Sequence, residues 1–321
     1  MLPDPVIKHL TYMCTRRTEG GKMRFKPHIN EETGVDEVAN IIGYCLALAQ
    51  QKYKMDIHAL VAMSNHLHYQ LTDTNANIPA FMHHVHRNIA NCINDLQNTT
   101  GPVWSRHKPG KSILVKNNDV MRNLTYIMCN PVEAGLVPEQ SEYISLVTKP
   151  EDYEDGGTEY EFDRPNYFFS DKGKMPEKLT LKITIPPGIH EGKPEKFVNN
   201  LKDRVFQRQE AIKEKRGNRP FLGNDAILKL DPFSVPKNGI EEGGFNPMLI
   251  CLDTVMRIAY ACFLRNWRKA YRKALLAYRA GDKDVVFPYG TYKLALEHDI
   301  KVEKTGCKVA SEMGVALPGF I

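Results

Sequence analysis

The residues best suited to do chemistry lie in the segment NHLHY, residues 65–69, where one leucine separates two histidines. The surrounding residues favour an extended strand, in which alternate side chains point to the same face. His66 and His68 therefore project together, whereas Leu67 and Tyr69 point to the opposite face. Two neutral imidazoles on one face can share a divalent cation, which predicts a metal site. The alternative is a histidine pair without metal, because a His-x-His motif alone is a weak signal.

A second polar cluster follows in HHVHRNIANCIN, residues 83–94, within a predicted helix. His86 and Asn94 are two turns apart, so both side chains could face the histidine pair. His86 would then be a further ligand or a general base. The alternative interpretation is that His83, His84 and His86 form a solvated helix start.

The elements that must position these residues follow from periodicity and from helix-capping signals. Strands are predicted over residues 6–17, 56–63, 65–72 and 112–116, and helices over 37–53, 78–96 and 119–129. Residues 64–65 form a short joint that predicts a hairpin, and the last helix is expected to stop before Pro131. The order β-α-β-β-α-β-α suits a small antiparallel sheet with helices on one face.

Composition limits the protein class. The chain has 321 residues, a net charge of +5 and 25% charged residues, which is ordinary for a globular protein of about two domains. No apolar run approaches the ~18 residues of a membrane span, and the first residues do not resemble a signal peptide. Seven scattered cysteines without a CxxC pair, Cys307 the last of them, indicate reduced thiols and a cytoplasmic location.

The composition changes after residue 150. We predict a first domain over residues 1–150, an acidic linker over 151–178, and a mainly helical, basic domain over 179–321. In the last of these, residues 179–185 read as a strand, 194–216 as a charged helix and 246–280 as a long helical stretch.

Two groups of basic residues are candidate DNA contacts. One is a loop after Trp104, where basic side chains could hold phosphates by charge; Trp104 itself is expected in the core. The other is the helical stretch between Thr254 and Ala280, which has basic but no acidic residues. A solvated basic surface is the alternative for both. The candidate contacts are Arg106, Lys108, Lys111, Arg265, Arg268, Lys269 and Arg272.

Four ordered segments within residues 6–140 resemble the single-tyrosine transposases of the HUH nuclease superfamily, in particular the REP-associated tyrosine transposases. They are VAMSNHLHYQLTD, PAFMHHVHRNIANCIN, GPVW and YIMCNPVEAGLV. The resemblance implies an α+β fold with a ferredoxin-like antiparallel sheet. The part after residue 150 is similar to the C-terminal extension of a longer branch.

The resemblance also implies a site. His66 and His68 would hold Mg²⁺ or Mn²⁺ at a scissile phosphate of single-stranded or hairpin DNA, and Asn94 would complete the metal shell. A tyrosine on the helix after the histidine strand would attack phosphorus. The helix over 78–96 has no tyrosine, however, and the expected position falls at Ile89 or Ala90. Tyr126 is expected to serve in packing.

Three functions therefore stay open. The first is metal-dependent cleavage and transfer of DNA strands, that is, DNA transposition. The second is a domesticated DNA-binding protein that is catalytically inactive because it lacks the nucleophile. The third is a nuclease in which water, activated by metal and a helix histidine, replaces tyrosine. The expected partner in each case is DNA, with no membrane, and the expected assembly is a monomer or homodimer.

Overall fold

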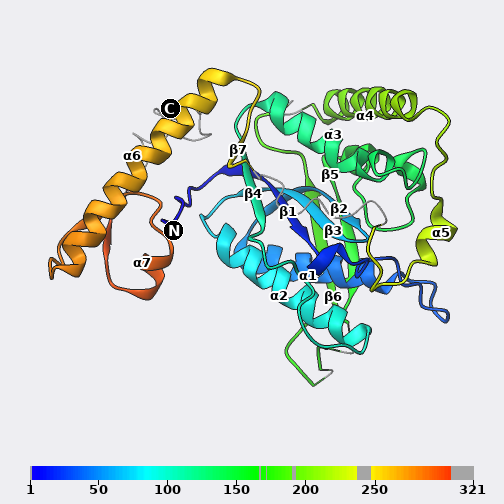
Figure 1. Ribbon diagram of the computed structural model, residues 1–321, viewed down its shortest axis with the longest axis horizontal. Helices are drawn as coiled ribbons and strands as arrows, with labels where there is room; N and C mark the ends of the chain where they lie inside the picture. The colour runs from blue at the N-terminus through cyan, green and yellow to red at the C-terminus, as the bar shows by residue number, and fades with distance from the viewer. Residues whose placement is uncertain (1, 166–167, 171, 190–192, 237–246, 305–321) are drawn as a thin grey trace.

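Residues 10–114 of the computed structural model fold as β-α-β-β-α-β (Figure 1). The structure describes residues 2–165, 168–170, 172–189, 193–236 and 247–304. The six elements are β1 (Leu10–Arg17), α1 (Glu37–Tyr53), β2 (Asp56–Met63), β3 (His66–Asp73), α2 (Ile78–Leu96) and β4 (Gly110–Leu114). The strands lie in the order β2-β3-β1-β4, and each neighbouring pair is antiparallel. This arrangement is the ferredoxin-like topology, so the predicted fold class is confirmed.

Local sequence signals explain where these elements begin and end. The carboxylate of Asp36 accepts a hydrogen bond from the Val38 amide at 3.1 Å and caps α1, which ends where Lys54 adopts a left-handed conformation. Asp73, the last residue of β3, accepts hydrogen bonds from three amides at the start of α2. Two residues, Ser64 and Asn65, connect β2 to β3, as the hairpin prediction required.

Helices cover both faces of the sheet. The two helices inside the motif, α1 and α2, pack together on one face, which agrees with the prediction. The opposite face is covered by α3 (Asn117–Glu133), and α4 (Pro194–Arg216) packs along α3 (Figure 1). The predicted stop before Pro131 is wrong, because α3 continues through this residue. Pro131 is in the last turn of α3. The backbone hydrogen bond that proline cannot donate is therefore lost only near the end of the helix, where its loss disrupts little of it.

The region after residue 150 extends the same sheet. Strands β5 (Gly157–Asp163) and β6 (Lys178–Thr184) join at the β2 edge, and β7 (Leu249–Ile250) joins at the β4 edge. Residues 151–178 were predicted as a linker, but they include β5. Its exposed carboxylates alternate with half-buried side chains and form ion pairs with β6, such as Glu159 with Lys182 at 2.6 Å. The predicted division into separate domains stays a prediction.

The rest of the described chain is mainly helical. It contains α5 (Asn224–Leu228), α6 (Thr254–Arg279) and α7 (Lys293–Glu297), with a small parallel pair of β8 (Val286–Phe287) and β9 (Lys301–Val302). Three short 3₁₀ segments lie at Glu19–Gly21, Gln140–Glu142 and Pro150–Tyr153. None of the described helices is both long and apolar enough to cross a bilayer. Six cysteines are free thiols in the described chain, and Cys307 lies outside it.

Candidate active site

The two histidines of β3 point to the face that α3 covers. Their ring centroids are 4.6 Å apart, with an angle of 76° between the rings. Across the strand pair, His66 is opposite Arg17 and His68 is opposite Thr15. The His66 side chain is half-buried, whereas His68 is only 7% exposed. The rings are therefore adjacent, as the strand alternation predicted, and one of them is partly open to solvent.

Asn65 and Asn130 determine how His66 can act. The Nδ1 of His66 lies 2.7 Å from Oδ1 of Asn65, and its Nε2 lies 3.3 Å from Oδ1 of Asn130 on α3. Burial lowers the pKa of His66 to about 4, with nearby Arg17 adding to the shift, so the ring is neutral at pH 7 and carries one N–H. If that N–H is donated to the closer Asn65 oxygen, the Nε2 lone pair is left facing Asn130.

His68 has an unpaired nitrogen. Its Nδ1 is buried and has no hydrogen-bond partner in the described chain. Burial lowers its pKa well below the ordinary value, and the nearby His66 and Arg17 act in the same direction. A buried polar atom without a partner destabilises the fold unless a ligand that binds there supplies the missing partner. His68 is thus a neutral ring, and its Nδ1 presents a free lone pair if the single ring proton is on Nε2.

Helix α3 brings a tyrosine to this histidine pair. The Tyr126 ring centroid lies 5.5 Å from that of His68, at an angle of 71°. Tyr126 and Asn130 are four residues apart, so they occupy the same face of α3 on successive turns. Tyr126 is half-buried, and burial, the largest cause, raises its pKa. Glu133 also raises it, whereas Asn130, Arg208 and Arg17 lower it.

Charged side chains surround the phenol. The Arg208 guanidinium from α4 lies 5.6 Å from the Tyr126 ring centroid and forms a 2.6 Å ion pair with Glu133. Arg17, exposed at the end of β1, is close enough to lower the pKa of both histidines. The site therefore combines two neutral imidazoles, an amide, a phenol and two guanidinium groups.

The predicted third ligand and the predicted tyrosine position are elsewhere. Asn94 is on α2, which packs on the other face of the sheet. Its Oδ1 accepts a hydrogen bond from Arg24 at 2.8 Å and its Nδ2 donates to the Gly101 carbonyl at 2.9 Å. Ile89 is fully buried in the core and Ala90 packs against it. The interpretation of Asn94 as a ligand is therefore wrong, because α2 and α3 lie on opposite sides of the strands.

Sequence reasoning missed Tyr126 and Asn130 as site residues. The signal was present in YIMCNPVEAGLV, where tyrosine and asparagine are one helical turn apart. The resemblance instead implies a nucleophile on the helix directly after the histidine strand and a packing role for Tyr126. Chain order pointed to α2, whereas the sheet topology places α3 over the histidines.

The histidines of α2 are not part of this site. His86 is buried, and its Nε2 lies 3.4 Å from the hydroxyl of Tyr69, the residue that alternates away from the histidine pair. The indole of Trp104 donates to the His86 carbonyl at 2.7 Å, which confirms that Trp104 belongs to the core. The solvated interpretation holds for His83, which is exposed, but not for His86.

The candidate DNA contacts are distributed over separate surfaces. Arg106 and Lys108 are exposed in the loop before β4. Lys111 is on β4 opposite Cys14, with its Nζ 5.6 Å from the Tyr12 ring, so its side chain turns inward. On α6, Arg265, Lys269 and Arg272 are exposed, whereas Arg268 forms a 2.6 Å ion pair with Asp4. Figure 1 shows α6 projecting beyond the β4 and β7 edge of the sheet.

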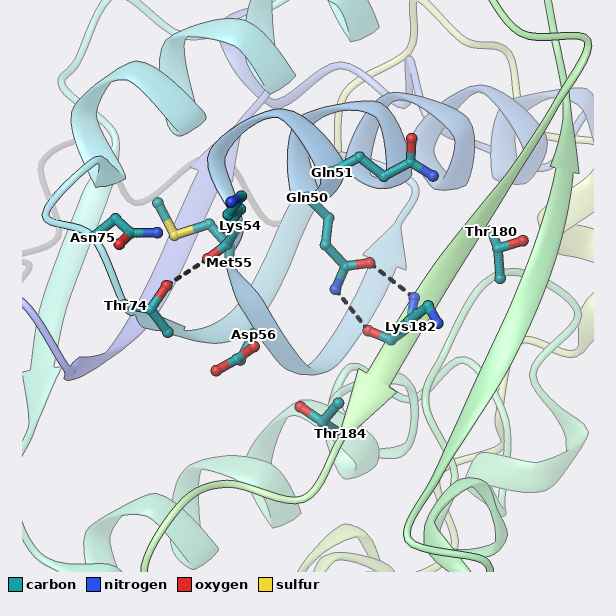
Figure 2. Close-up of a pocket in the computed structure, with 10 residues that line it drawn as sticks. All are labelled: Gln50, Gln51, Lys54, Met55, Asp56, Thr74, Asn75, Thr180, Lys182 and Thr184. Atoms are coloured by element: carbon teal, nitrogen blue, oxygen red, sulfur yellow. Dashed lines mark hydrogen bonds between the residues drawn. The ribbon is translucent and has the colours of Figure 1, made fainter. Parts of the chain in front are cut away.

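A cavity of about 400 Å³, lined mostly by polar residues, lies at the other end of the strands (Figure 2). It is lined by Asp56, the first residue of β2, whereas the histidine pair adjoins Met63, the last. Figure 2 shows the Gln50 amide bridging to the backbone of Lys182 in β6. At ~3.3 Å per residue, the strand separates this cavity from the histidines by about 20 Å.

The donor set fits a divalent cation. Two ligands at about 2.1 Å from a six-coordinate cation are about 3 Å apart, close to the 3.3 Å between His66 Nε2 and Asn130 Oδ1. The unpaired Nδ1 of His68 is a further donor. Imidazole nitrogen with amide oxygen suits several divalent metals, Mn²⁺ among them. Among the described residues, histidine, cysteine, aspartate and glutamate alone form no three-ligand cluster, so Asn130 is essential to this set.

No family model matches this sequence, and no curated protein matches it. One similar solved structure is a REP-associated tyrosine transposase bound to a REP hairpin. It is 15% identical, with a TM-score of 0.36, over 46% of this chain and 81% of that chain. Another is the crystal structure of a putative transposase from Deinococcus radiodurans, 20% identical with a TM-score of 0.27, over 38% of this chain and 90% of that chain. What this chain does must therefore be inferred from its own residues.

Proposed function

We propose that this protein is a transposase-like enzyme that cleaves and rejoins single-stranded or hairpin DNA, with Tyr126 as the nucleophile. One observation carries the proposal: α3 places Tyr126 against His68 and Asn130 against His66. A phenol beside a neutral, metal-competent donor set is the arrangement that tyrosine-based phosphoryl transfer needs.

The chemistry is a transesterification. The Tyr126 oxygen attacks phosphorus, a bond from phosphorus to the phenolic oxygen forms, and the bond from phosphorus to the 3′ oxygen breaks. The phenol proton passes to solvent, and the leaving 3′ oxygen takes up a proton to become a 3′-hydroxyl. The product is a 5′-phosphotyrosine whose bond energy allows a 3′-hydroxyl to rejoin the strand without ATP.

The residues of the site divide this work. His66, His68 and Asn130 would hold Mg²⁺ or Mn²⁺, which when bound would polarise the scissile phosphate and offset its developing charge. Asn65 fixes the ring of His66 through the 2.7 Å contact to Nδ1. Arg17 extends the positive charge toward an approaching DNA backbone.

The rival proposal, a DNA-binding protein without catalysis, depended on the missing tyrosine in residues 78–96. Tyr126 supplies a phenol at the histidine pair from another helix, which favours catalysis. A neutral His86 that could activate water is buried on the other face of the sheet, which disfavours the water-driven nuclease. A cytoplasmic location and a monomeric or dimeric state stay predictions.

A covalent adduct tests the proposal. The protein is incubated with Mn²⁺ and a pool of oligonucleotides that share a hairpin stem, have randomised single-stranded flanks, and carry a 3′ label. The labelled fragment should stay on the protein through a denaturing gel, and mass spectrometry should place it on Tyr126. Tyr126→Phe should abolish the adduct. Tyr53→Phe, which removes the hydroxyl of a half-buried tyrosine on α1, on the other face of the sheet, should leave it unchanged.

The other outcomes contradict the proposal. Cleavage without an adduct would indicate attack by water. Binding of the pool without cleavage, unaffected by His66→Ala and His68→Ala, would indicate a DNA-binding protein only. No binding at low salt would exclude DNA as the substrate.

A further inference from the structure

Helix α4 reaches the candidate active site from the C-terminal region. It lies along α3 and is attached at several points: the thiol of Cys129 donates to the Val205 carbonyl at 3.7 Å, and the Gln140 amide donates to Oε1 of Gln209 at 2.7 Å. Val205 and Gln209 are buried. Arg208, between them, is thus presented to α3 by a helix that is fixed on either side of it.

Arg208 makes two contacts with α3. Its guanidinium lies 5.6 Å from the Tyr126 ring centroid, and one of its terminal nitrogens contacts Glu133 at 2.6 Å. The Nε atom of Arg208 is buried and has no hydrogen-bond partner in the described chain. Hydrogen bonds therefore do not satisfy every donor of Arg208 in its position over the ring. The ion pair with Glu133 holds the guanidinium there.

Two groups thus contact the Tyr126 ring: the imidazole of His68 and the guanidinium of Arg208. His68 meets it edge-on at 5.5 Å between centroids, and Arg208 meets it at 5.6 Å. A planar guanidinium over an aromatic ring is an attractive and orienting contact. Two such contacts restrict the ring to a narrow range of orientations, which a nucleophile aimed at phosphorus requires.

We propose that Arg208 is a positioning residue for Tyr126, so that the C-terminal region completes a site whose other residues come from β1, β3 and α3. The expected effect on the rate of adduct formation rests on the proposed function, whereas the expected effect on the orientation of the Tyr126 ring does not. Loss of the guanidinium should leave the cation ligands in place and release the ring.

Arg204 offers a matched control. It lies one turn before Arg208 on the same helix and hydrogen-bonds to Asn200 and Asn118 rather than to an aromatic ring. Arg208→Met and Arg204→Met remove the same charge and keep a similar aliphatic length. Arg208→Lys retains the charge without the planar group.

The first measurement needs no activity. The protein is labelled with 3-fluorotyrosine, and the ¹⁹F signal of residue 126 is assigned by its absence in Tyr126→Phe. Arg208→Met should shift and broaden this signal, whereas Arg204→Met should leave it in place. An unchanged signal in Arg208→Met would overturn the proposal, whether or not the wild-type protein is active.

The second measurement is the single-turnover rate of adduct formation with Mn²⁺ and the labelled hairpin pool. Arg208→Met should slow it by roughly 10- to 100-fold with less than a threefold change in hairpin affinity, and Arg208→Lys should restore part of the rate. Arg204→Met should react at the wild-type rate. A wild-type rate in Arg208→Met would overturn positioning. Absence of an adduct in the wild-type protein would instead reject the proposed function, and the ¹⁹F result would then decide on positioning.

Discussion

The two faces of the central sheet use the same residue types for different purposes. Under α1 and α2, the hydroxyl of Tyr69 contacts His86, and both side chains are buried with Trp104 close by. Under α3, Tyr126 contacts His68, but Tyr126 is half-buried and one nitrogen of His68 has no partner among the residues that the structure describes. Histidine and tyrosine side by side are therefore not evidence of a site by themselves.

What separates these two histidine–tyrosine pairs is whether their polar atoms have partners and are accessible. On the α2 face, the histidine and tyrosine complete a packed interior, which contributes to stability. On the α3 face, Nε2 of His66 lies 3.3 Å from Oδ1 of Asn130, and Nδ1 of His68 has no hydrogen-bond partner among the described residues, which is an arrangement that a bound cation would resolve. The first face should respond to mutation through stability, and the second through metal binding and chemistry.

The largest expected effect is on metal binding. The double variant His66→Ala, His68→Ala should lower Mn²⁺ affinity by at least ~100-fold, because it removes both imidazole ligands. His86→Ala should leave the affinity within about twofold but lower the free energy of unfolding by about 1–3 kcal/mol, since it leaves a buried cavity and an unpaired Tyr69 hydroxyl. Calorimetric titration and denaturant unfolding measure the two effects. Loss of affinity in His86→Ala would contradict the assignment of faces.

The two faces should also differ in which property depends on pH: Mn²⁺ affinity on the α3 face and stability on the α2 face. A cation binds neutral imidazole, and the pKa of His66 is lowered to about 4, so Mn²⁺ affinity should be nearly constant from pH 7 to about 5. It should then fall by about tenfold per pH unit for each ring protonated. An affinity that begins to fall near pH 6.5 would contradict the lowered pKa and indicate solvated rings.

On the other face, the pH effect is on folding. Burial lowers the pKa of His86 to about 3, below its unfolded value near 6.5. Its contribution to stability is therefore complete above pH 6.5 and is lost as the pH falls from there toward the folded pKa. His86→Leu should reduce the slope of unfolding free energy between about pH 6 and 4 by up to ~1.4 kcal/mol per pH unit. Urea unfolding across this range tests the expectation, which an unaltered slope would contradict.

An intermediate effect is expected from the two asparagines. Asn130→Ala should lower Mn²⁺ affinity by roughly tenfold, because it removes the oxygen 3.3 Å from His66. Asn94→Ala should leave metal binding unchanged and destabilise the fold by ~1 kcal/mol, because the largely buried Arg24 loses one acceptor. If Asn94→Ala weakens Mn²⁺ binding and Asn130→Ala does not, the ligand set is wrong.

The smallest effects are expected from the exposed basic residues. Replacing Arg265, Lys269 and Arg272 of α6 with alanine should weaken hairpin binding by a few-fold. It should also reduce the slope of log binding constant against log salt concentration by ~0.7 for each phosphate contact that is lost. The pair Arg106→Ala, Lys108→Ala tests the loop in the same way. Fluorescence anisotropy at several salt concentrations gives both slopes. If neither set of substitutions changes the slope, the DNA binds to another surface.

The sequence by itself determined the four central strands of the sheet and half of the site. Strand alternation in NHLHY placed His66 and His68 on one face, and the two-residue joint at 64–65 formed the expected hairpin. The order of elements predicted an antiparallel sheet with helices on one face, and the family resemblance implied the ferredoxin-like arrangement. These features depend on periodicity and on turns, which act between near neighbours in the chain.

Only the tertiary structure decided which helix faces the histidines. Tyr126 and Asn130 are about 60 residues from His66 in the chain, and Arg208 is further still. They come together at the histidine pair because α3 covers the face opposite α1 and α2 and α4 packs along α3. No local pattern specifies on which side of a sheet a later helix packs. That choice depends on how the whole apolar surface is buried, and it converts a histidine pair into a candidate active site.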